Sequence, residues 1–258
     1  MESIKTYLRG RLDFKKRRFL KRIYEQLITF PHVNDLNRLA RIYKTDKWGS
    51  HFYTPHYQHH FLPFKNKKIN ILEIGVGGYD SPIYGGDSLR MWKRFFPKAN
   101  IYSLDIYDKS LLQEKRIKIF QGSQVDEKFL EGVVNEIGEL SLIIDDGSHI
   151  NEHIISTFNL LFPKLKFGGI YVVEDIQTSY WPDYGGSGEE MNKEGTAMHF
   201  FKSLIDGLNH AEFIRPGYRA SYYDLNITSM HFYHNLVFIY KGPNNEGSNL
   251  VINNERLL

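Results

Sequence analysis

The chain has 258 residues, a formal net charge of +3 at pH 7 and no cysteine. A chain of this length buries about 70–75% of its unfolded surface, so one α/β domain or two small ones can fold without a cross-link. The absence of cysteine excludes disulfides, zinc–thiolate sites, iron–sulfur clusters and a cysteine nucleophile, and a 41% hydrophobic, 24% charged composition indicates a globular protein.

The positive charge is concentrated at the N-terminus. Residues 1–24 hold nine of the 33 bases and two of the 30 acids, a net +7, which leaves a net −4 for the remainder. Apolar residues at three-to-four spacing predict helices over residues 1–44, with a break at Phe30-Pro31. We therefore expect a basic N-terminal helical appendage, residues 1–44, followed by a second domain, residues 45–258.

Six short apolar runs and four helical stretches follow. The runs cover residues 69–74, 101–105, 117–120, 140–146, 169–175 and 236–240, and the helical stretches cover 87–95, 127–137, 151–165 and 196–209. Strands that alternate with helices at this spacing predict an α/β fold with a doubly wound, mainly parallel sheet. Residues 45–64 read as an aromatic, histidine-rich loop, and residues 178–194 as a candidate lid.

No membrane-spanning or secretory segment is expected. The chain has no run of 18 apolar residues, and its first residues lack the apolar stretch of a signal peptide. We expect a cytoplasmic protein that the basic first helix can bring to the periphery of a membrane.

Glycines and a carboxylate follow the first apolar run. Glu73, Gly75 and Gly77 stand there, and the second run ends in Asp105, where a carboxylate can accept hydrogen bonds from a ribose diol. The glycines also suit an ordinary tight turn. Residues 80–86 separate them from the next helix, whereas a dinucleotide fold places the helix N-terminus on the pyrophosphate. An acidic loop here favours a ligand without phosphates that carries a cationic centre, such as S-adenosylmethionine.

The fourth and fifth runs end in acids. Asp145 and Asp146 follow one, and Glu174 and Asp175 follow the other. Neighbouring parallel strands would bring these carboxylates together, where they repel unless a cation lies among them. Oxygen ligands indicate Mg²⁺, with Mn²⁺ or Ca²⁺ as alternatives. We assign Asp145 to capping of the next helix and the other three acids to the metal.

Two histidines follow the fourth run. His149 lies three residues after Asp146, where a neutral imidazole could act as a base toward a metal-bound hydroxyl. His153 lies four residues further on and could join His149 on one helix face as a two-histidine metal pair. That pair would make a non-haem iron hydroxylase dependent on 2-oxoglutarate, which stays open as a rival enzyme.

Several long motifs lie along the chain. They are residues 44–49 (KTDKWG), 53–57 (YTPHY), 72–79 (LEIGVGGY), 86–92 (GDSLRMW), 145–149 (DDGSH), 173–175 (VED) and 231–235 (HFYHN). Together they resemble the metal-dependent sugar O-methyltransferases of macrolide biosynthesis, the mycinamicin and macrocin type. The resemblance implies a class I, Rossmann-like methyltransferase fold and a homo-oligomer.

The resemblance also implies roles for individual residues. Asp146, Glu174 and Asp175 would hold Mg²⁺ together with two neighbouring sugar hydroxyls, and His149 would be the base, so that Asp146 and His149 form the catalytic pair. Ser123 and Gln124 would lie near the adenine of S-adenosylmethionine, and Tyr53 and Tyr57 would close over the cofactor. The full candidate cofactor set is Glu73, Gly75, Gly77, Asp105, Ser123, Gln124, Asp145, Tyr53 and Tyr57.

Three functions are therefore weighed. The leading one is an S-adenosylmethionine- and Mg²⁺-dependent O-methyltransferase acting on a sugar hydroxyl, with no nucleic-acid partner. Only 5 alanines against 17 asparagines argue against a macrolide, because macrolide producers are usually GC-rich and alanine-rich. They favour a sugar on a surface polysaccharide, a lipopolysaccharide or another secondary metabolite. The others are the iron hydroxylase and a non-enzymatic adaptor whose basic helix binds a membrane or nucleic acid.

Overall fold

The computed structural model describes residues 13–252, 255 and 256 and divides them into two compact units. One unit contains the described residues up to Lys67 together with Arg90–Lys98, and the other contains Lys68–Leu89 and the described residues from Ala99 onwards. The first twelve residues of the expected basic appendage lie outside the described residues. The boundary expected between residues 44 and 45 stays a prediction.

The N-terminal unit is helical. Its elements are α2 (Phe14–Thr29), η1 (Phe30–His32), α3 (Leu36–Tyr43), α4 (Thr54–Phe61), η2 (Leu62–Phe64) and the larger part of α5 (Asp87–Phe95). Asp13 caps α2 by accepting from the backbone amide of Lys16, and Asp35 caps α3 by accepting from that of Arg38. The expected break at Phe30-Pro31 is confirmed, because a 3-10 turn separates α2 from α3 there.

The predicted loop over residues 45–64 is wrong in part, since α4 lies within it. Its aromatic and histidine residues give no apolar stripe in the sequence, yet Tyr57 and Phe61, four residues apart, pack on the same neighbour. The ring centroid of Trp92 lies 5.0 Å from that of Tyr57 and 5.8 Å from that of Phe61. Long-range aromatic packing stabilises this helix, which local periodicity did not indicate.

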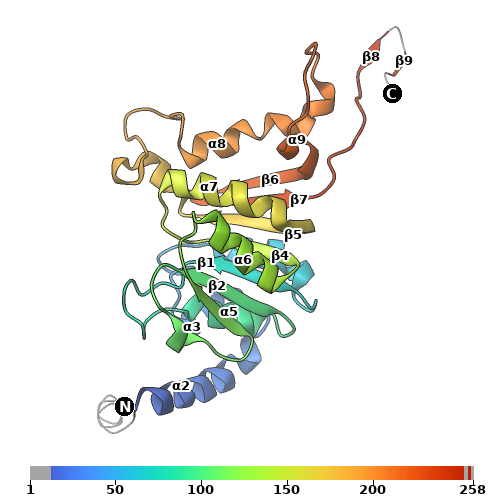
Figure 1. Cartoon of the computed structure of the whole chain (residues 1–258). Helices are drawn as coiled ribbons and strands as arrows, with labels where there is room; N and C mark the ends of the chain where they lie inside the picture. The colour runs from blue at the N-terminus through green and yellow to red at the C-terminus, as the bar shows by residue number, and fades with distance from the viewer. Residues whose placement is uncertain (1–12, 253–254, 257–258) are drawn as a thin grey trace. The chain divides into compact units, whose positions relative to one another are not determined.

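The second unit is built on a seven-stranded sheet with the order β3-β2-β1-β4-β5-β7-β6 (Figure 1). The strands are β1 (Asn70–Ile74), β2 (Asn100–Asp105), β3 (Ile117–Gln121), β4 (Leu140–Asp145), β5 (Leu165–Glu174), β6 (Ile227–Tyr233) and β7 (Leu236–Lys241). Strands β1 to β5 pair in parallel, whereas β7 pairs antiparallel with both β5 and β6. The mainly parallel, doubly wound sheet is confirmed.

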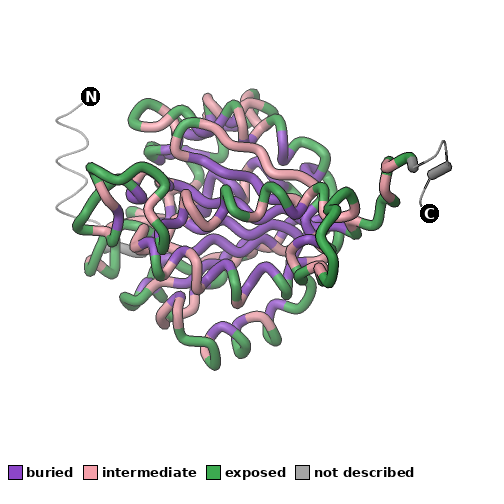
Figure 2. Tube along the Cα trace, turned by 90° about the horizontal axis from the view of Figure 1, so that it is seen from above, coloured by how far each residue is buried: buried purple, intermediate pink, exposed green. Residues whose placement is uncertain are grey.

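Helices pack on one face of this sheet. Figure 1 shows α6 (Glu127–Ile137) and α7 (Asn151–Leu161) side by side across the strands, and α8 (Ala197–Ser203) contacts α7. Phe158 of α7 and Tyr171 of β5 are fully buried in this layer, with ring centroids 5.0 Å apart. Figure 2 shows buried residues along the strands, and every residue of β4 is buried.

Several boundaries differ from the sequence prediction. The helix expected over 151–165 ends at Leu161, because β5 already begins at Leu165, and the helix expected over 196–209 divides into α8 and η7 (Asp206–Glu212). Strand β6 was not predicted. The remaining elements are η3 (Ser110–Leu112), η4 (Phe162–Lys164), η5 (Ile176–Tyr180), η6 (Pro182–Tyr184), α9 (Tyr222–Asn226), β8 (Val251–Ile252) and β9 (Glu255–Arg256). Among the described helices, none is both long and apolar enough to cross a membrane.

Candidate active site

The acidic residues singled out in the sequence meet at one edge of the sheet. Strands β1, β4 and β5 are neighbours, and their carboxyl ends carry Glu73, Asp146 and Glu174 respectively. Carboxylate oxygens of these three residues lie within 4.8 Å of one another. The expectation that neighbouring strands would bring together the acids of the fourth and fifth runs is confirmed for Asp146 and Glu174, and Glu73 of β1 joins them.

A second group shares Asp146 with the first. Ligand atoms of Asp146, His149 and Asp175 also lie within 4.8 Å of one another, and all three side chains are half-buried. The predicted metal set of Asp146, Glu174 and Asp175 is therefore divided between two overlapping groups. Carboxylates held this close repel one another, so the donor chemistry suits a hard divalent cation with oxygen ligands.

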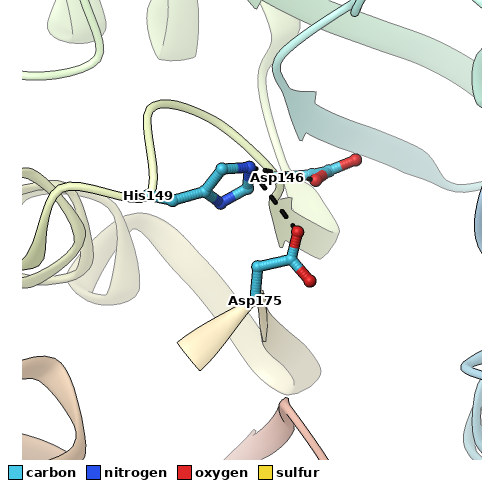
Figure 3. A group of neighbouring side chains, drawn as sticks. All are labelled: Asp146, His149 and Asp175. Carbon is cyan, nitrogen blue, oxygen red and sulfur yellow. Dashed lines mark ion pairs between the residues drawn. The ribbon is translucent and has the colours of Figure 1, made fainter. Parts of the chain in front are cut away.

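His149 faces both aspartates. Its Nε2 lies 3.8 Å from Oδ1 of Asp146 and 3.7 Å from Oδ2 of Asp175, as the dashed lines in Figure 3 show. The backbone of His149 is left-handed, with φ of +59°, and so is that of Asp175, with φ of +53°. Non-glycine residues rarely adopt this conformation, and such strain concentrates at functional sites.

The glycine turn after β1 is packed against the acidic strand end. Gly75 has φ of +92°, and a Cβ added there would lie 2.1 Å from the backbone oxygen of Asp146. Only glycine allows this close approach of two strand ends. Gly77 also has a positive φ, +73°, but has nothing within 4 Å of an added Cβ. The first glycine therefore shapes the site, and the second provides a turn with open space beside it.

Asp105 holds the turn after β1, and Glu73 connects β1 to the start of α5. Asp105 accepts from the amide of Val76 at 3.0 Å with one carboxylate oxygen and from the amide of Tyr107 at 2.9 Å with the other. Glu73 is fully buried and accepts from the hydroxyl of Ser88 at 3.0 Å. Asp105 thus contacts the glycine turn, and the contact of either residue with a cofactor stays a prediction.

Asp145 is buried beneath this edge rather than placed on a helix end. The N-cap of α7 is Ile150, with no side-chain cap, so the capping role assigned to Asp145 is wrong. Instead its carboxyl accepts from the hydroxyl of Tyr171 and from the amide of Gln124, each at 3.4 Å. Burial, followed by the nearby Asp146 charge, raises the pKa of Asp145 to about 7.

Ser123 and Gln124 lie in the turn after β3. The hydroxyl of Ser123 accepts from the amide of Val125 at 3.3 Å. The Gln124 side chain is buried, donates to the hydroxyl of Thr157 at 3.0 Å and accepts from the amide of Ser148 at 2.8 Å. Gln124 thus supports the loop that carries Asp146 and His149, and proximity of either residue to adenine stays a prediction.

Tyr53 and Tyr57 belong to the N-terminal unit. Tyr53 is buried and stacks on His51 with ring centroids 4.7 Å apart. Tyr57 of α4 is also buried, and its ring packs against that of Trp92. Their proposed closure over a cofactor stays a prediction.

The two-histidine metal pair is not formed. His149 precedes α7, whereas His153 lies in its first turn, where Nδ1 is 2.9 Å from the hydroxyl of Ser148. Within the described part of the chain, His153 belongs to neither group of metal-ligating atoms. The left-handed conformation of His149 breaks the helical spacing on which the pair depended.

Two supporting residues were missed from the sequence. Lys109 is fully buried, and its ammonium donates to three backbone oxygens of the loop after β1, those of Tyr79, Ser81 and Tyr84. A lone lysine in an irregular segment gives no sequence signal for such a role.

Asn151, also buried, holds the predicted lid at both ends. Its Nδ2 donates to the oxygens of Thr178 and Tyr184, and its Oδ1 accepts from Ser179 and Ala197. The base of the 178–194 segment is thus fixed, while Glu189 to Met191 are exposed.

No family model matches the chain. It is 47% identical over 215 residues to the mycinamicin VI 2''-O-methyltransferase of Micromonospora griseorubida, a match that covers 83% of this chain and 54% of that protein. It is 46% identical over 213 residues to the 8-demethyl-8-alpha-L-rhamnosyl tetracenomycin-C 2'-O-methyltransferase of Streptomyces olivaceus, covering 82% of this chain and 56% of that protein. The chain thus spans about half the length of the curated relatives it matches.

A solved structure agrees with this relationship. The MycE methyltransferase of the mycinamycin pathway, in complex with Mg and SAH, superposes with a TM-score of 0.81 at 46% identity, over 85% of this chain and 57% of that one. A further structure of the same methyltransferase, with Mg, SAH and mycinamycin VI, gives a TM-score of 0.80 at 45% identity over the same shares of the two chains.

Proposed function

The chain belongs to the metal- and S-adenosylmethionine-dependent sugar O-methyltransferases over the region that matches, and we propose that it transfers a methyl group from S-adenosylmethionine to a sugar hydroxyl. Its sheet is the class I, Rossmann-like methyltransferase fold. The observation that carries the proposal is the pair of overlapping groups on Asp146, one with Glu73 and Glu174 and one with His149 and Asp175.

The cofactor would lie along the glycine turn after β1. Gly77 has open space beside its backbone, where a ligand could approach, while Gly75 packs against the Asp146 strand end and Asp105 ends β2 beside the turn. Both oxygens of Asp105 already accept one backbone amide each and retain lone pairs for a ribose diol. A cofactor bound with its sulfonium beside the buried carboxylate of Glu73 would be favoured over its neutral product.

Asp146, Glu174 and Asp175 would hold Mg²⁺. When bound, Mg²⁺ supplies Lewis-acid chemistry that lowers the pKa of a sugar hydroxyl and fixes its direction. The carboxylates of Asp146 and Asp175 also lie 3.8 and 3.7 Å from Nε2 of His149, so the base and the proposed cation would be neighbours in this site.

His149 would remove the hydroxyl proton at Nε2. The neutral imidazole accepts a proton at Nε2 only when Nδ1 carries the hydrogen, and Nδ1 is the buried nitrogen, without a hydrogen-bond partner among the described residues. The imidazolium formed after proton transfer is stabilised by the two aspartates at 3.7 and 3.8 Å. When bound, S-adenosylmethionine would supply the methyl group that the deprotonated sugar oxygen receives.

The acceptor is proposed from the relatives. They are named for mycinamicin, macrocin and tetracenomycin sugars, and one solved relative holds mycinamycin VI. These names do not support the preference for polysaccharide or lipopolysaccharide sugars. We therefore propose a glycosylated small molecule whose sugar offers neighbouring hydroxyls, and we keep glycans as a comparison in the assay.

A methyl-transfer assay tests the proposal. The full chain is incubated with S-adenosylmethionine, Mg²⁺ and a panel of rhamnosylated and other glycosylated acceptors, and methylated product is detected by mass spectrometry. We expect product that disappears with EDTA and falls by about 100-fold or more in His149→Gln, since loss of a general base costs about that much. The matched control is His153→Gln, which lies outside both ligand groups and should retain activity.

Two outcomes would contradict the proposal. Turnover retained in His149→Gln would remove His149 as the base. Methylated product formed equally well in EDTA would remove the metal from the reaction. The cytoplasmic location and the homo-oligomer expected from the resemblance are also proposals, and light scattering on the purified chain tests the second.

A further inference from the structure

The exposed face of α2 is apolar, and its inward face is polar. Six large apolar side chains along α2 and the residue after it are exposed by 41% to 76%. They are Phe19, Leu20, Ile23, Tyr24, Leu27 and Phe30. In contrast, Glu25 and Thr29 are buried, so the usual amphipathic arrangement of a surface helix is reversed.

Polar contacts within the same unit fix this orientation. The buried carboxylate of Glu25 lies 3.7 Å from Arg90 and 3.4 Å from Lys21. Arg94 donates to the backbone oxygen of Gln26 at 3.1 Å. Rotation of α2 to bury its apolar face would break these contacts, so the helix is anchored with that face turned outward.

The apolar face is large for an exposed surface. With aromatic side chains of about 150–250 Å² each, the six residues expose about 600–700 Å². The largest apolar patch on a typical monomer is about 300–600 Å² and commonly marks an interaction site. Residues 19–30 extend about 17 Å along the helix axis, a length suited to an elongated contact.

Positive charge surrounds this face. Residues 13–30 contain six bases and two acids, a net +4. At 100° per residue, the exposed Arg17 borders the apolar face on one side, with Lys21 beyond it, and the exposed Lys16 falls within the face toward its N-terminal end. Two copies paired through this face would bring like charges together, whereas an anionic surface complements them.

We propose that α2 binds an anionic lipid surface. The helix lies in the plane of the membrane, with the six apolar side chains in the boundary between headgroups and acyl chains and with the flanking bases on anionic headgroups. This surface is independent of the site around Asp146 and does not rest on the proposed methyl transfer.

Vesicle flotation with the full chain tests the proposal. We expect binding to vesicles of equal parts phosphatidylcholine and phosphatidylglycerol, weak binding to phosphatidylcholine alone, and release at high salt. Phe19→Ser with Leu27→Ser should weaken binding by about tenfold or more. Arg17→Gln should weaken it by about fivefold, since each base near an anionic surface contributes about 1 kcal/mol.

Matched controls separate this face from general surface properties. Met191→Ser with Ile214→Ser removes two apolar side chains that are exposed elsewhere, by 85% and 81%, and should leave binding unchanged. Lys128→Gln removes an exposed base elsewhere and should also have no effect. Circular dichroism checks that each variant is folded.

Self-association is the outcome that most directly overturns the proposal. Sedimentation analysis without vesicles shows whether the chain is a dimer that Phe19→Ser with Leu27→Ser dissociates. Such a dimer without vesicle binding would assign the face to a second copy. Equal binding to both vesicle types, or unchanged binding of the double variant, would also refute lipid recognition by α2.

Discussion

Gly75 and Gly77 offer a matched pair for testing how the glycine turn shapes the site. Both have positive φ, +92° and +73°, so replacement by alanine adds backbone strain at each position. Only at Gly75 does the added Cβ collide with another strand end, 2.1 Å from the backbone oxygen of Asp146. The comparison therefore isolates the collision from the strain.

The expected magnitudes differ accordingly. Gly77→Ala should destabilise the protein by about 1–2 kcal/mol, the cost of a left-handed residue. Gly75→Ala adds overpacking, typically about 1–3 kcal/mol, which gives about 2–5 kcal/mol in total. Relief of the collision requires displacement of Asp146. We therefore expect Mg²⁺ affinity to fall by about 10–100-fold, as it does when a residue that orients a metal ligand is replaced.

Urea unfolding followed by circular dichroism measures the first effect, and calorimetric titration with Mg²⁺ measures the second. Gly77→Ala serves as the control in both. If Gly75→Ala were no more destabilising than Gly77→Ala and bound Mg²⁺ normally, the packing of the glycine turn against the Asp146 strand end would be refuted.

Three further predictions concern buried groups near the site. Burial raises the pKa of Asp145 from 3.8 to about 7, so between these pH values the folded state holds a proton that the unfolded state has lost. In EDTA, the free energy of unfolding should therefore fall by about 2–4 kcal/mol as the pH rises from about 4 to 7. Asp145→Asn should abolish this pH dependence, measured by urea unfolding. Lys109→Met leaves the oxygens of the loop after β1 without their donor, and S-adenosylhomocysteine should bind about tenfold more weakly by calorimetry, while normal affinity would deny Lys109 a positioning role. Asn151→Ala removes four hydrogen bonds at the base of the lid and should lower the free energy of unfolding by about 2–4 kcal/mol. Proteolysis within residues 178–194 should become faster, and an unchanged digestion rate would show that other residues hold the lid.

The parallel part of the fold was predictable because its strands are continuous apolar runs. Ile143 and Ile144, like Val172 and Val173, are fully buried on both faces of the sheet, and such burial leaves a direct trace in the sequence. Strand β6 left none, because most of its residues are half-buried and polar residues such as Ser229 and His231 interrupt its pattern. This strand forms by pairing with β7, a contact that the local sequence pattern does not show.

The acidic part of the site was also predictable, since it follows from strand ends. The positions of Asp146 and Glu174 at neighbouring strand ends were enough to predict that they meet, whereas Glu73 was expected at the cofactor and not in this group. Burial depth was not predictable: Asp145 and Asp146 are adjacent in sequence, yet successive residues of a strand point to opposite sides, so one is buried beneath the edge and the other reaches the ligand groups. The left-handed turn at His149 likewise has no sequence signal.

Calorimetric titration of the purified chain with S-adenosylhomocysteine, with and without Mg²⁺, tests the central claim most directly. A cofactor site on the glycine turn and Asp105 predicts saturable binding to the wild-type chain, weakened by about tenfold or more in Asp105→Ala, which loses the carboxylate proposed for the ribose. No detectable binding by the wild-type chain at high protein concentration, in either condition, would contradict it.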